Sequence, residues 1–302
     1  MSTRPPILTV LGPTASGKSA LAIRLAKTLG AEILSADSRQ CYKGMSIGTS
    51  ATTPEEQLGL THHYVQSISP HQPESASSFS IFANKVMEET QRKGTPLIIV
   101  GGSTLYLQAL FFPLASLPPA SKENLEELER QESREGLQSL YRKLERVDPH
   151  YASTMDGLNR QRIFRALDVW MQTGEPFSSY HSQQEQGYDN PTNPVVQSQP
   201  VFGLHMDRAM LHDRIAKRVK HMIDRGLQDE VEQLLKSGCS WESSPMKSVG
   251  YREWKPFFEG NASLKEVQEA IIVATRQYAK RQMTWFRRWP FVQWIHAGVS
   301  GR

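Results

Sequence analysis

The sequence predicts an α/β fold with a parallel sheet, and two observations carry this prediction. Ile7–Leu11, Ala31–Ala36 and Pro96–Val100 are short, nearly continuous apolar runs, which are typical of strands buried on both faces. A helical pattern begins near Lys18, after the first run, and stops at Gly30, just before the second. Buried strands that alternate with helices favour a parallel sheet flanked by helices.

The composition excludes several classes of protein. The chain has 302 residues, of which 38% are hydrophobic and 22% charged, enough for a substantial core. Cys41 and Cys239 are the only cysteines, which excludes a disulfide framework and a multi-cysteine zinc module. No apolar run has the length of a membrane span, and Met1–Pro6 lacks the apolar core of a signal peptide, so we expect a cytoplasmic protein with no membrane partner.

A change in composition at Pro118–Pro119 marks a helical insertion. The stretch Ser121–Val147 is charged and carries regularly spaced leucines, which predicts one helix that Asp148–Pro149 terminates. A second amphipathic helix is expected from about Gln161 to Thr173, ending at Gly174.

The segment His181–Pro200 is rich in Gln, Asn and Pro and is expected to be a mobile surface loop. Together these segments predict a helical insertion domain at residues 117–199. The insertion divides a discontinuous catalytic core of residues 1–116 and 200–302.

Two long helices are expected after the insertion. In the first, from Asp207, apolar residues share one arc: Leu211, Ile215, Val219 and Met222. An adjacent arc is basic: Arg214, Arg218, His221 and Arg225. The second helix opens with a capping box, Ser263–Glu266, and ends before Pro290.

The net charge of +4 permits an anionic partner, and its distribution is more informative than its sum. No acidic residue follows Glu269, and basic residues there interleave with Tyr278, Trp285, Phe286 and Trp289. Such residues could bind phosphates and stack on unpaired bases, although aromatic residues at helical spacing more often belong to a core.

Gly12–Ser19 fits the pattern G-x-x-x-x-G-K-[ST] and predicts a P-loop NTPase-like core. The predicted diphosphate-binding residues are Gly12, Pro13, Thr14, Ala15, Ser16, Gly17, Lys18 and Ser19. In such loops, backbone amides and a helix N-terminus surround phosphate oxygens, the lysine adds a positive charge, and the serine hydroxyl binds Mg²⁺.

The loop alone does not say whether the ligand is a nucleotide. A phosphate-loop NTPase usually has a second carboxylate at the end of another strand, to help hold Mg²⁺. Here Pro96–Val100 ends in Gly101–Ser103, and Asp37 is the only carboxylate at a predicted strand end. This pattern argues against ATP hydrolysis.

Further motifs extend over nearly the whole chain, from Gly12 to about Trp289. They are Ser35–Tyr42, Ile47–Thr49, His62–His63, Val100–Tyr106, Asn159–Leu167, Gly250–Arg252 and Thr275–Gln282. In this order they closely resemble the tRNA dimethylallyltransferase family. The absence of a zinc-finger tail favours a bacterial or compact form.

The resemblance implies a reaction. Dimethylallyl diphosphate, held by the phosphate loop with Mg²⁺, donates its prenyl group to the exocyclic N6 of the adenosine 3′ to a tRNA anticodon. The tRNAs would be those that read codons beginning with U, and the protein would be a monomer. By resemblance Asp37 is the catalytic base, Ser103 supplies a hydroxyl near the diphosphate and the amine, and Arg218 binds the leaving diphosphate.

The resemblance also implies contacts with the anticodon stem-loop. These residues are Asp37, Ser38, Arg39, Gln40, Ser103, Gln161, Arg162, Ile163, Phe164, Arg165, Lys247, Ser248, Val249, Gly250, Tyr251 and Arg252. Two departures put the strength of these contacts in question. Ser50–Pro54 lacks a lysine that is common in the family, and Leu125 replaces a basic residue.

Two alternatives remain open from the motifs alone. One is a small-molecule kinase, or an isopentenyltransferase acting on free AMP or ADP, although such proteins lack the insertion 117–199 and the basic segment 270–289. The other is a non-catalytic RNA-binding module with a vestigial phosphate loop, against which the intact Lys18, Asp37 and Arg218 argue.

Overall fold

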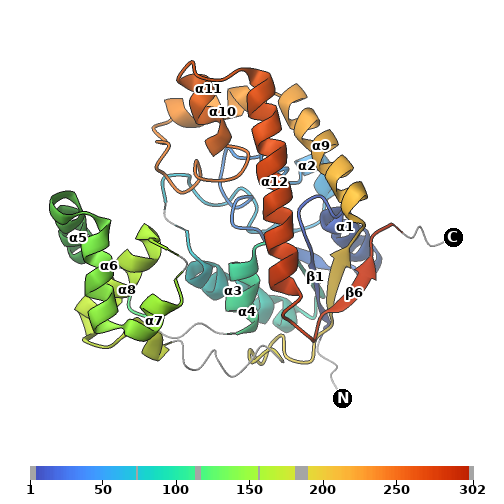
Figure 1. Ribbon diagram of the computed structural model, residues 1–302. Coiled ribbons are helices and arrows are strands. Elements are labelled where there is room, and N and C mark those ends of the chain that lie inside the picture. Colours follow the sequence, from blue (N-terminus) through green and yellow to red (C-terminus); the bar gives the residue numbers. More distant parts are fainter. Residues whose placement is uncertain (1–4, 73, 113–116, 156, 181–189, 299–302) are drawn as a thin grey trace. The chain divides into compact units, whose positions relative to one another are not determined.

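The computed structural model describes residues 5–72, 74–112, 117–155, 157–180 and 190–298 (Figure 1). The chain forms two compact units. The first combines residues 1–113 with 189–302, and the second comprises residues 114–188.

The first unit is built on a six-stranded sheet in which every pair of neighbouring strands is parallel, in the order β3-β2-β4-β1-β5-β6. The strands are β1 (Ile7–Leu11), β2 (Glu32–Ala36), β3 (His62–His63), β4 (Leu97–Gly101), β5 (Val201–His205) and β6 (Gln293–His296). The predicted α/β class with a parallel sheet is confirmed.

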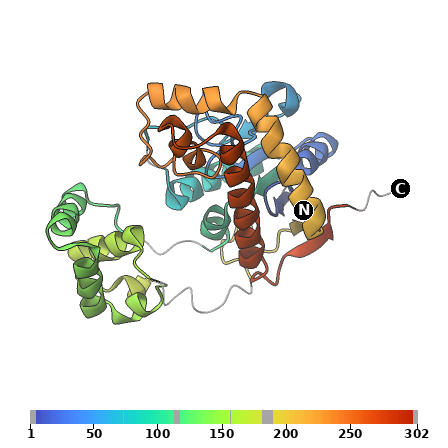
Figure 2. The ribbon, with the colours of Figure 1, turned by 45° about the horizontal axis from the view of Figure 1, so that its top comes forward.

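The first unit also contains eight helices among the described residues. They are α1 (Lys18–Leu29), α2 (Pro54–Gln57), α3 (Ala76–Lys93), α4 (Thr104–Phe111), α9 (Arg208–Asp224), α10 (Leu227–Lys236), α11 (Lys255–Phe258) and α12 (Leu264–Phe286), with a 3₁₀ turn η2 (Arg252–Trp254). Helix α1 packs on the sheet face that carries Val10, Ile33 and Ile98. Side chains alternate along a strand, so Ile99 points to the opposite face of the sheet. It is fully buried there, which shows that this face is covered as well. Helices α9 and α12 lie side by side (Figures 1 and 2).

The carboxyl ends of the parallel strands meet at one edge of the sheet, where ligands bind in folds of this type. Strand β1 leads to the phosphate loop, β2 to Asp37 and β4 to Ser103. The amide of Ser103 donates to the carbonyl of Ala36 at 3.2 Å. A Cβ on Gly101 would lie 2.1 Å from that carbonyl oxygen, so only glycine permits this approach of β4 to β2.

The second unit is helical, with α5 (Lys122–Glu135), α6 (Leu137–Val147), α7 (Pro149–Ser153), α8 (Arg160–Thr173) and the turn η1 (Phe177–Tyr180). The expected single helix over Ser121–Val147 is wrong. Gly136, at φ 78° and ψ 163°, ends α5 and begins α6, which lets both helices bury their leucines in one core. Helix α8 agrees with the predicted helix to within one residue.

The predicted loop His181–Pro200 is described only from residue 190, since residues 181–189 lie outside the described part. Residues 190–200 run partly over the surface, as predicted, but part of this segment is buried. Asn193 is buried and donates from Nδ2 to the carbonyl of Leu110 at 2.8 Å, and Val196 is buried as well. These contacts fasten the segment to the end of α4. Among the described helices, none combines the length and the apolar character that a bilayer crossing requires.

Candidate active site

The phosphate loop wraps the N-terminus of α1. Gly17 is the N-cap at φ 88°, a left-handed conformation that favours glycine, so no capping side chain occupies the first-turn amides of α1. Lys18 turns back over the loop, and its Nζ donates to the carbonyl of Pro13 at 3.1 Å. Ser16 Oγ is buried and has no hydrogen-bond partner among the described residues. The loop therefore presents unused donors to an anion.

Lys18, Asp37 and Arg218 form the charged centre of the site. Burial lowers the pKa of the Lys18 ammonium to about 8; the negative charge of Asp37 opposes this shift, and the positive charge of Arg218 adds to it. Burial also lowers the pKa of Arg218, again opposed by Asp37. Two half-buried cations beside one carboxylate leave an excess of positive charge, which suits a diphosphate.

One oxygen of Asp37 is fixed by the backbone. Oδ1 accepts hydrogen bonds from the amides of Arg39 at 2.9 Å and Gln40 at 3.1 Å. Among the described residues, Oδ2 has no such partner. Asp37 therefore forms a local turn, as an aspartate after a strand commonly does, and it also presents a free oxygen to the site.

Two cavities meet at these residues. The smaller, of about 70 Å³, lies against the phosphate loop, and its lining includes Lys18, Ser19 and Asp37. The larger, of about 360 Å³, is lined by polar residues and by Leu105, Val219, Met222 and Ile271. Thr14, Asp37, Thr49, Arg218 and Tyr278 line both. A ligand with a charged end and an apolar end can therefore extend from one cavity into the other.

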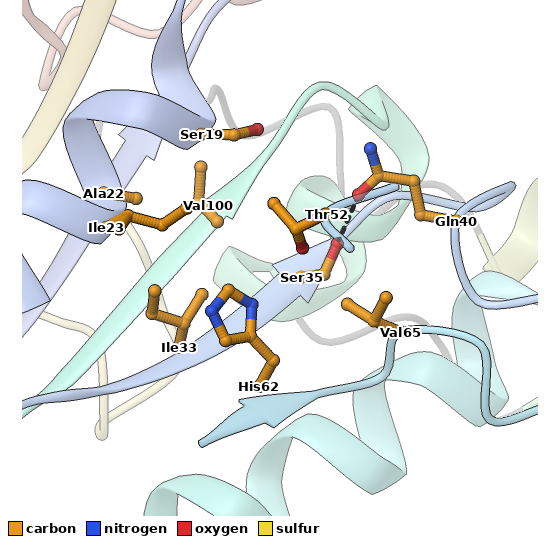
Figure 3. A pocket seen from close by; sticks show the side chains of 10 residues that line it. All are labelled: Ser19, Ala22, Ile23, Ile33, Ser35, Gln40, Thr52, His62, Val65 and Val100. Carbon is orange, nitrogen blue, oxygen red and sulfur yellow. Dashed lines mark hydrogen bonds between the residues drawn. The ribbon is translucent and has the colours of Figure 1, made fainter. Parts of the chain in front are cut away.

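A third pocket, between α1 and the sheet, is too small for an organic group (Figure 3). It measures about 10 Å³ and is mostly apolar, with the His62 ring beside it. Such a volume holds at most about one water molecule. Within it, Ser35 Oγ donates to Gln40 Oε1 at 3.3 Å, which fixes the Gln40 side chain. Of the three, the 360 Å³ cavity is the one that can accept an apolar ligand group.

Ser103 is at the N-cap position of α4, but its side chain makes no capping hydrogen bond. The residue is buried and lines the larger cavity together with Asp37. A hydroxyl that caps the following helix is the ordinary role of serine at this position. The hydroxyl of Ser103 is instead available to a ligand.

The site offers oxygen ligands of the kind that Mg²⁺ prefers. The described residues contain no group of three or more His, Cys, Asp or Glu side chains that could hold a metal. Ser19 and Asp37, however, line the same small cavity. Mg²⁺ usually takes one or two protein oxygens and completes its shell with phosphate oxygens and water, so the donor set fits.

The basic arc of α9 does not act as one surface. Arg218 lines both cavities, and the Arg214 guanidinium lies next to Gly17 of the phosphate loop. His221 and Arg225 are exposed and line neither cavity, and α9 already ends at Asp224. The basic arc is therefore not a single ligand-binding surface: Arg225 shares the direction of Arg218 on the helical wheel but lies seven residues further along, at the C-cap of α9.

The segments predicted to bind tRNA differ in exposure. Ser38, Arg39, Lys247, Ser248, Val249, Gly250 and Arg252 line the larger cavity, and Gln40 lines the smaller one. In the helical unit Gln161 and Arg162 are exposed.

Three of the side chains predicted to contact tRNA are buried, and a fourth is held in an ion pair. Ile163 and Phe164 belong to the core of the helical unit, and Tyr251 is fully buried. Arg165 is paired with the buried Asp168 at 2.8 Å. The burial of Ile163, Phe164 and Tyr251 gives these three side chains a structural role, whereas Arg165 is still partly exposed. Leu125 also packs against the core of the helical unit.

The aromatic residues of the C-terminal segment divide in the same way. Phe286 and Trp289 are buried, which confirms their expected place in the core. Trp285 is partly exposed beside Arg288, whose guanidinium lies 5.2 Å from the ring centroid. Tyr278 lines both cavities, and burial raises its pKa to about 12.

Sequence reasoning assigned no role to two residues of the site. Gln282 Oε1 accepts from the amide of Thr14 at 2.8 Å, and its Nε2 donates to the carbonyl of Gly102 at 2.7 Å, so it joins the phosphate loop to the end of β4. The carbonyl of Thr49 accepts from Arg218 Nη2 at 2.9 Å. Both residues lie in motifs that carry the family resemblance, which was the available signal.

Comparison with known proteins agrees with this geometry. A family model described as IPP transferase matches residues 40–289. The chain belongs to the IPP transferase family. It is 41% identical over 291 residues to "tRNA dimethylallyltransferase 1" of Pelobacter propionicus, which covers 96% of this chain and 92% of that protein.

Solved structures of this family have the same fold. The tRNA isopentenylpyrophosphate transferase of Staphylococcus epidermidis matches with a TM-score of 0.69 and 33% identity, over 98% of this chain and 94% of that one. A eukaryotic dimethylallyltransferase acting on tRNA matches with a TM-score of 0.78, over 97% of this chain and 74% of that one; at 24% identity it supports the fold alone. The resemblance found in the motifs is confirmed, and this IPP transferase is an enzyme.

Proposed function

We propose that this IPP transferase moves the dimethylallyl group of dimethylallyl diphosphate to the exocyclic N6 of the adenosine 3′ to the anticodon, in tRNAs that read codons beginning with U. Diphosphate is the other product. One observation carries the proposal: a small charged cavity at the phosphate loop shares Asp37 and Arg218 with a larger, partly apolar cavity. The diphosphate of the donor molecule needs the charged cavity, and its dimethylallyl group needs the partly apolar one.

The charged cavity binds the diphosphate. Backbone amides of the phosphate loop Gly12–Ser19 that have no partner within the protein hold its oxygens together with the Lys18 ammonium, and Arg218 adds a rigid pair of donors. Negative charge grows on the diphosphate as the C1–O bond breaks, so donors already in place stabilise the transition state. Ser19 would hold Mg²⁺, which neutralises part of the diphosphate charge when it is bound.

Asp37 activates the acceptor. The N6 of adenine is a weak nucleophile, because its lone pair is delocalised into the ring. Oδ1 is held by two amides, so Oδ2 is the oxygen that accepts a hydrogen bond from N6 and takes its proton as the N6–C1 bond forms. The Ser103 hydroxyl, free of any capping bond, orients the amine or the diphosphate.

The tRNA approaches over the larger cavity, whose lining includes the basic side chains of Arg39, Lys247, Arg252 and Arg281. The adenosine has to leave the stack of the anticodon loop to reach Asp37, which requires base extrusion. Gln161 and Arg162 of the helical unit provide a second contact with the stem-loop. The enzyme acts as a monomer in the cytoplasm, where its tRNA substrates are found.

The test is to incubate the protein with labelled dimethylallyl diphosphate, Mg²⁺ and unmodified tRNA whose anticodon is followed by adenosine. Label should enter this tRNA and not a matched tRNA with guanosine at that position. Label that stays out of both tRNAs, or that enters free AMP equally well, would refute the proposal.

A further inference from the structure

Glu230 is a buried carboxylate outside the catalytic machinery described above. It lies in the first turn of α10 and lines neither of the two described cavities. Its oxygens nevertheless accept five hydrogen bonds. Oε2 accepts from the amide of Ser46 at 2.8 Å, from its hydroxyl at 3.1 Å and from the amide of Ile47 at 2.7 Å. Oε1 accepts from the amide of Gly48 at 2.9 Å and from the hydroxyl of Tyr251 at 2.7 Å.

Three consecutive backbone amides thus converge on one carboxylate. Such a concave set of amides is an anion-binding nest, and here the anion is a side chain of the protein itself. Hydrogen bonds to an ionised acceptor are about twice as strong as those between neutral groups. Without the carboxylate, the buried amide of Gly48 and its neighbours would have no acceptor, and the turn would rearrange.

Tyr251 couples a second loop to the same carboxylate. A Cβ on Gly48 would lie 2.6 Å from Tyr251 Cζ, so the ring packs directly on the glycine. Burial, together with the charge of Glu230, raises the pKa of the Tyr251 hydroxyl well above its usual range, and the hydroxyl remains a donor. Glu230 therefore holds the turn 46–49 and the loop 247–252 together.

The turn presents its next residue to the active site. The carbonyl of Thr49 accepts from Arg218 Nη2 at 2.9 Å and from Gln40 Nε2 at 3.3 Å. Gly48 and Thr49 also line the larger cavity. A continuous chain of contacts thus leads from Glu230 through the turn to the guanidinium that faces both cavities.

We propose that Glu230 is a positioning residue, which fixes the turn 46–49 so that the carbonyl of Thr49 holds Arg218 ready for the diphosphate. The inference rests on the proposed function, in which Arg218 binds the leaving group. An arginine held in advance loses less conformational entropy when it binds its ligand. Removal of Glu230 should therefore weaken diphosphate binding even though Glu230 does not reach the ligand.

The test compares Glu230→Gln with Glu232→Gln, a matched change on the same helix at an exposed side chain paired with Lys236. The affinity for inorganic diphosphate with Mg²⁺ is measured by calorimetry, and folding by thermal unfolding. Glutamine has the same shape but would point amide hydrogens at backbone donors. We expect diphosphate to bind about tenfold more weakly to folded Glu230→Gln, and with unchanged affinity to Glu232→Gln.

An Arg218→Ala background separates positioning from general structural damage. If Glu230 acts through Arg218, Glu230→Gln should cause no further loss of diphosphate affinity once Arg218 is absent. An equal loss on both backgrounds, or no loss in the single variant, would overturn the inference. Should Glu230→Gln fail to fold, Glu230→Asp keeps the charge but is too short for all five bonds, and a several-fold loss is expected. Wild-type protein that binds diphosphate but does not prenylate tRNA would refute the proposed function and leave this test intact.

Discussion

Replacement of Asp37 by asparagine removes the proposed base and leaves the local structure intact. Asparagine keeps an Oδ1 that can accept from the amides of Arg39 and Gln40, so the turn after β2 should persist. What disappears is the negative charge and the free oxygen that could take a proton. Asp37→Ala removes the same oxygen and both hydrogen bonds as well.

Asp37→Asn and Asp37→Ala should therefore show the same loss of prenyl-transfer rate but different losses in the free energy of unfolding. Loss of a general base costs roughly 10²–10⁴-fold in rate, or about 3–5 kcal/mol of transition-state stabilisation. The two backbone hydrogen bonds are worth about 1 kcal/mol each, so Asp37→Ala should be about 2 kcal/mol less stable than Asp37→Asn. Without Mg²⁺, both variants should bind inorganic diphosphate more tightly, because Lys18 and Arg218 then face no carboxylate.

Single-turnover transfer of labelled prenyl group to tRNA measures the rate, calorimetry measures diphosphate binding, and denaturant unfolding measures stability. Asp37→Asn with more than a tenth of the wild-type rate would refute the assignment of Asp37 as the base. If the two variants bind diphosphate more weakly than the wild type, Asp37 helps to organise the phosphate loop, and its charge does not oppose that of Lys18 and Arg218.

Three further predictions concern other parts of the chain. The pKa of Lys18 is lowered by burial to about 8, so diphosphate affinity should fall as the pH rises through 8, by up to tenfold per unit, and a flat titration would contradict this. The same shift means that the buried ammonium disfavours folding below pH 8, and that this penalty fades as the pH rises towards 10.5. Gly48→Ala should push the Tyr251 ring aside and cost about 1–3 kcal/mol in thermal unfolding; an unchanged midpoint would mean that the turn yields freely. Asp168→Ala leaves Arg165 without its carboxylate and should destabilise the helical unit by about 3 kcal/mol, which hydrogen exchange would report as faster exchange in α8 with α1 unaffected.

Much of the fold could be predicted because strands and helices leave patterns of apolar and polar residues among near neighbours in the sequence. The apolar runs of β1, β2 and β4 need burial on both faces, and the predicted bounds agree with the structure to within one residue. Strands β3, β5 and β6 were not predicted: β3 has two residues, β5 is a short run interrupted by Gly203, and β6 is a half-exposed edge strand. Gly136 was overlooked for a related reason: its backbone angles follow from how α5 and α6 share a core.

The sequence by itself determined the phosphate loop, the carboxylate Asp37 at the end of a strand and the motifs that identify the family. Only the tertiary structure decided what each charged side chain does. Arg218 and Arg225 look alike on the helical wheel, yet one lines both cavities and the other is exposed. Glu230 has no motif of its own, and its role depends on amides more than 180 residues away in the chain. Burial and hydrogen bonding between distant segments decide such roles, because a charge acts strongly only where the fold excludes water around it.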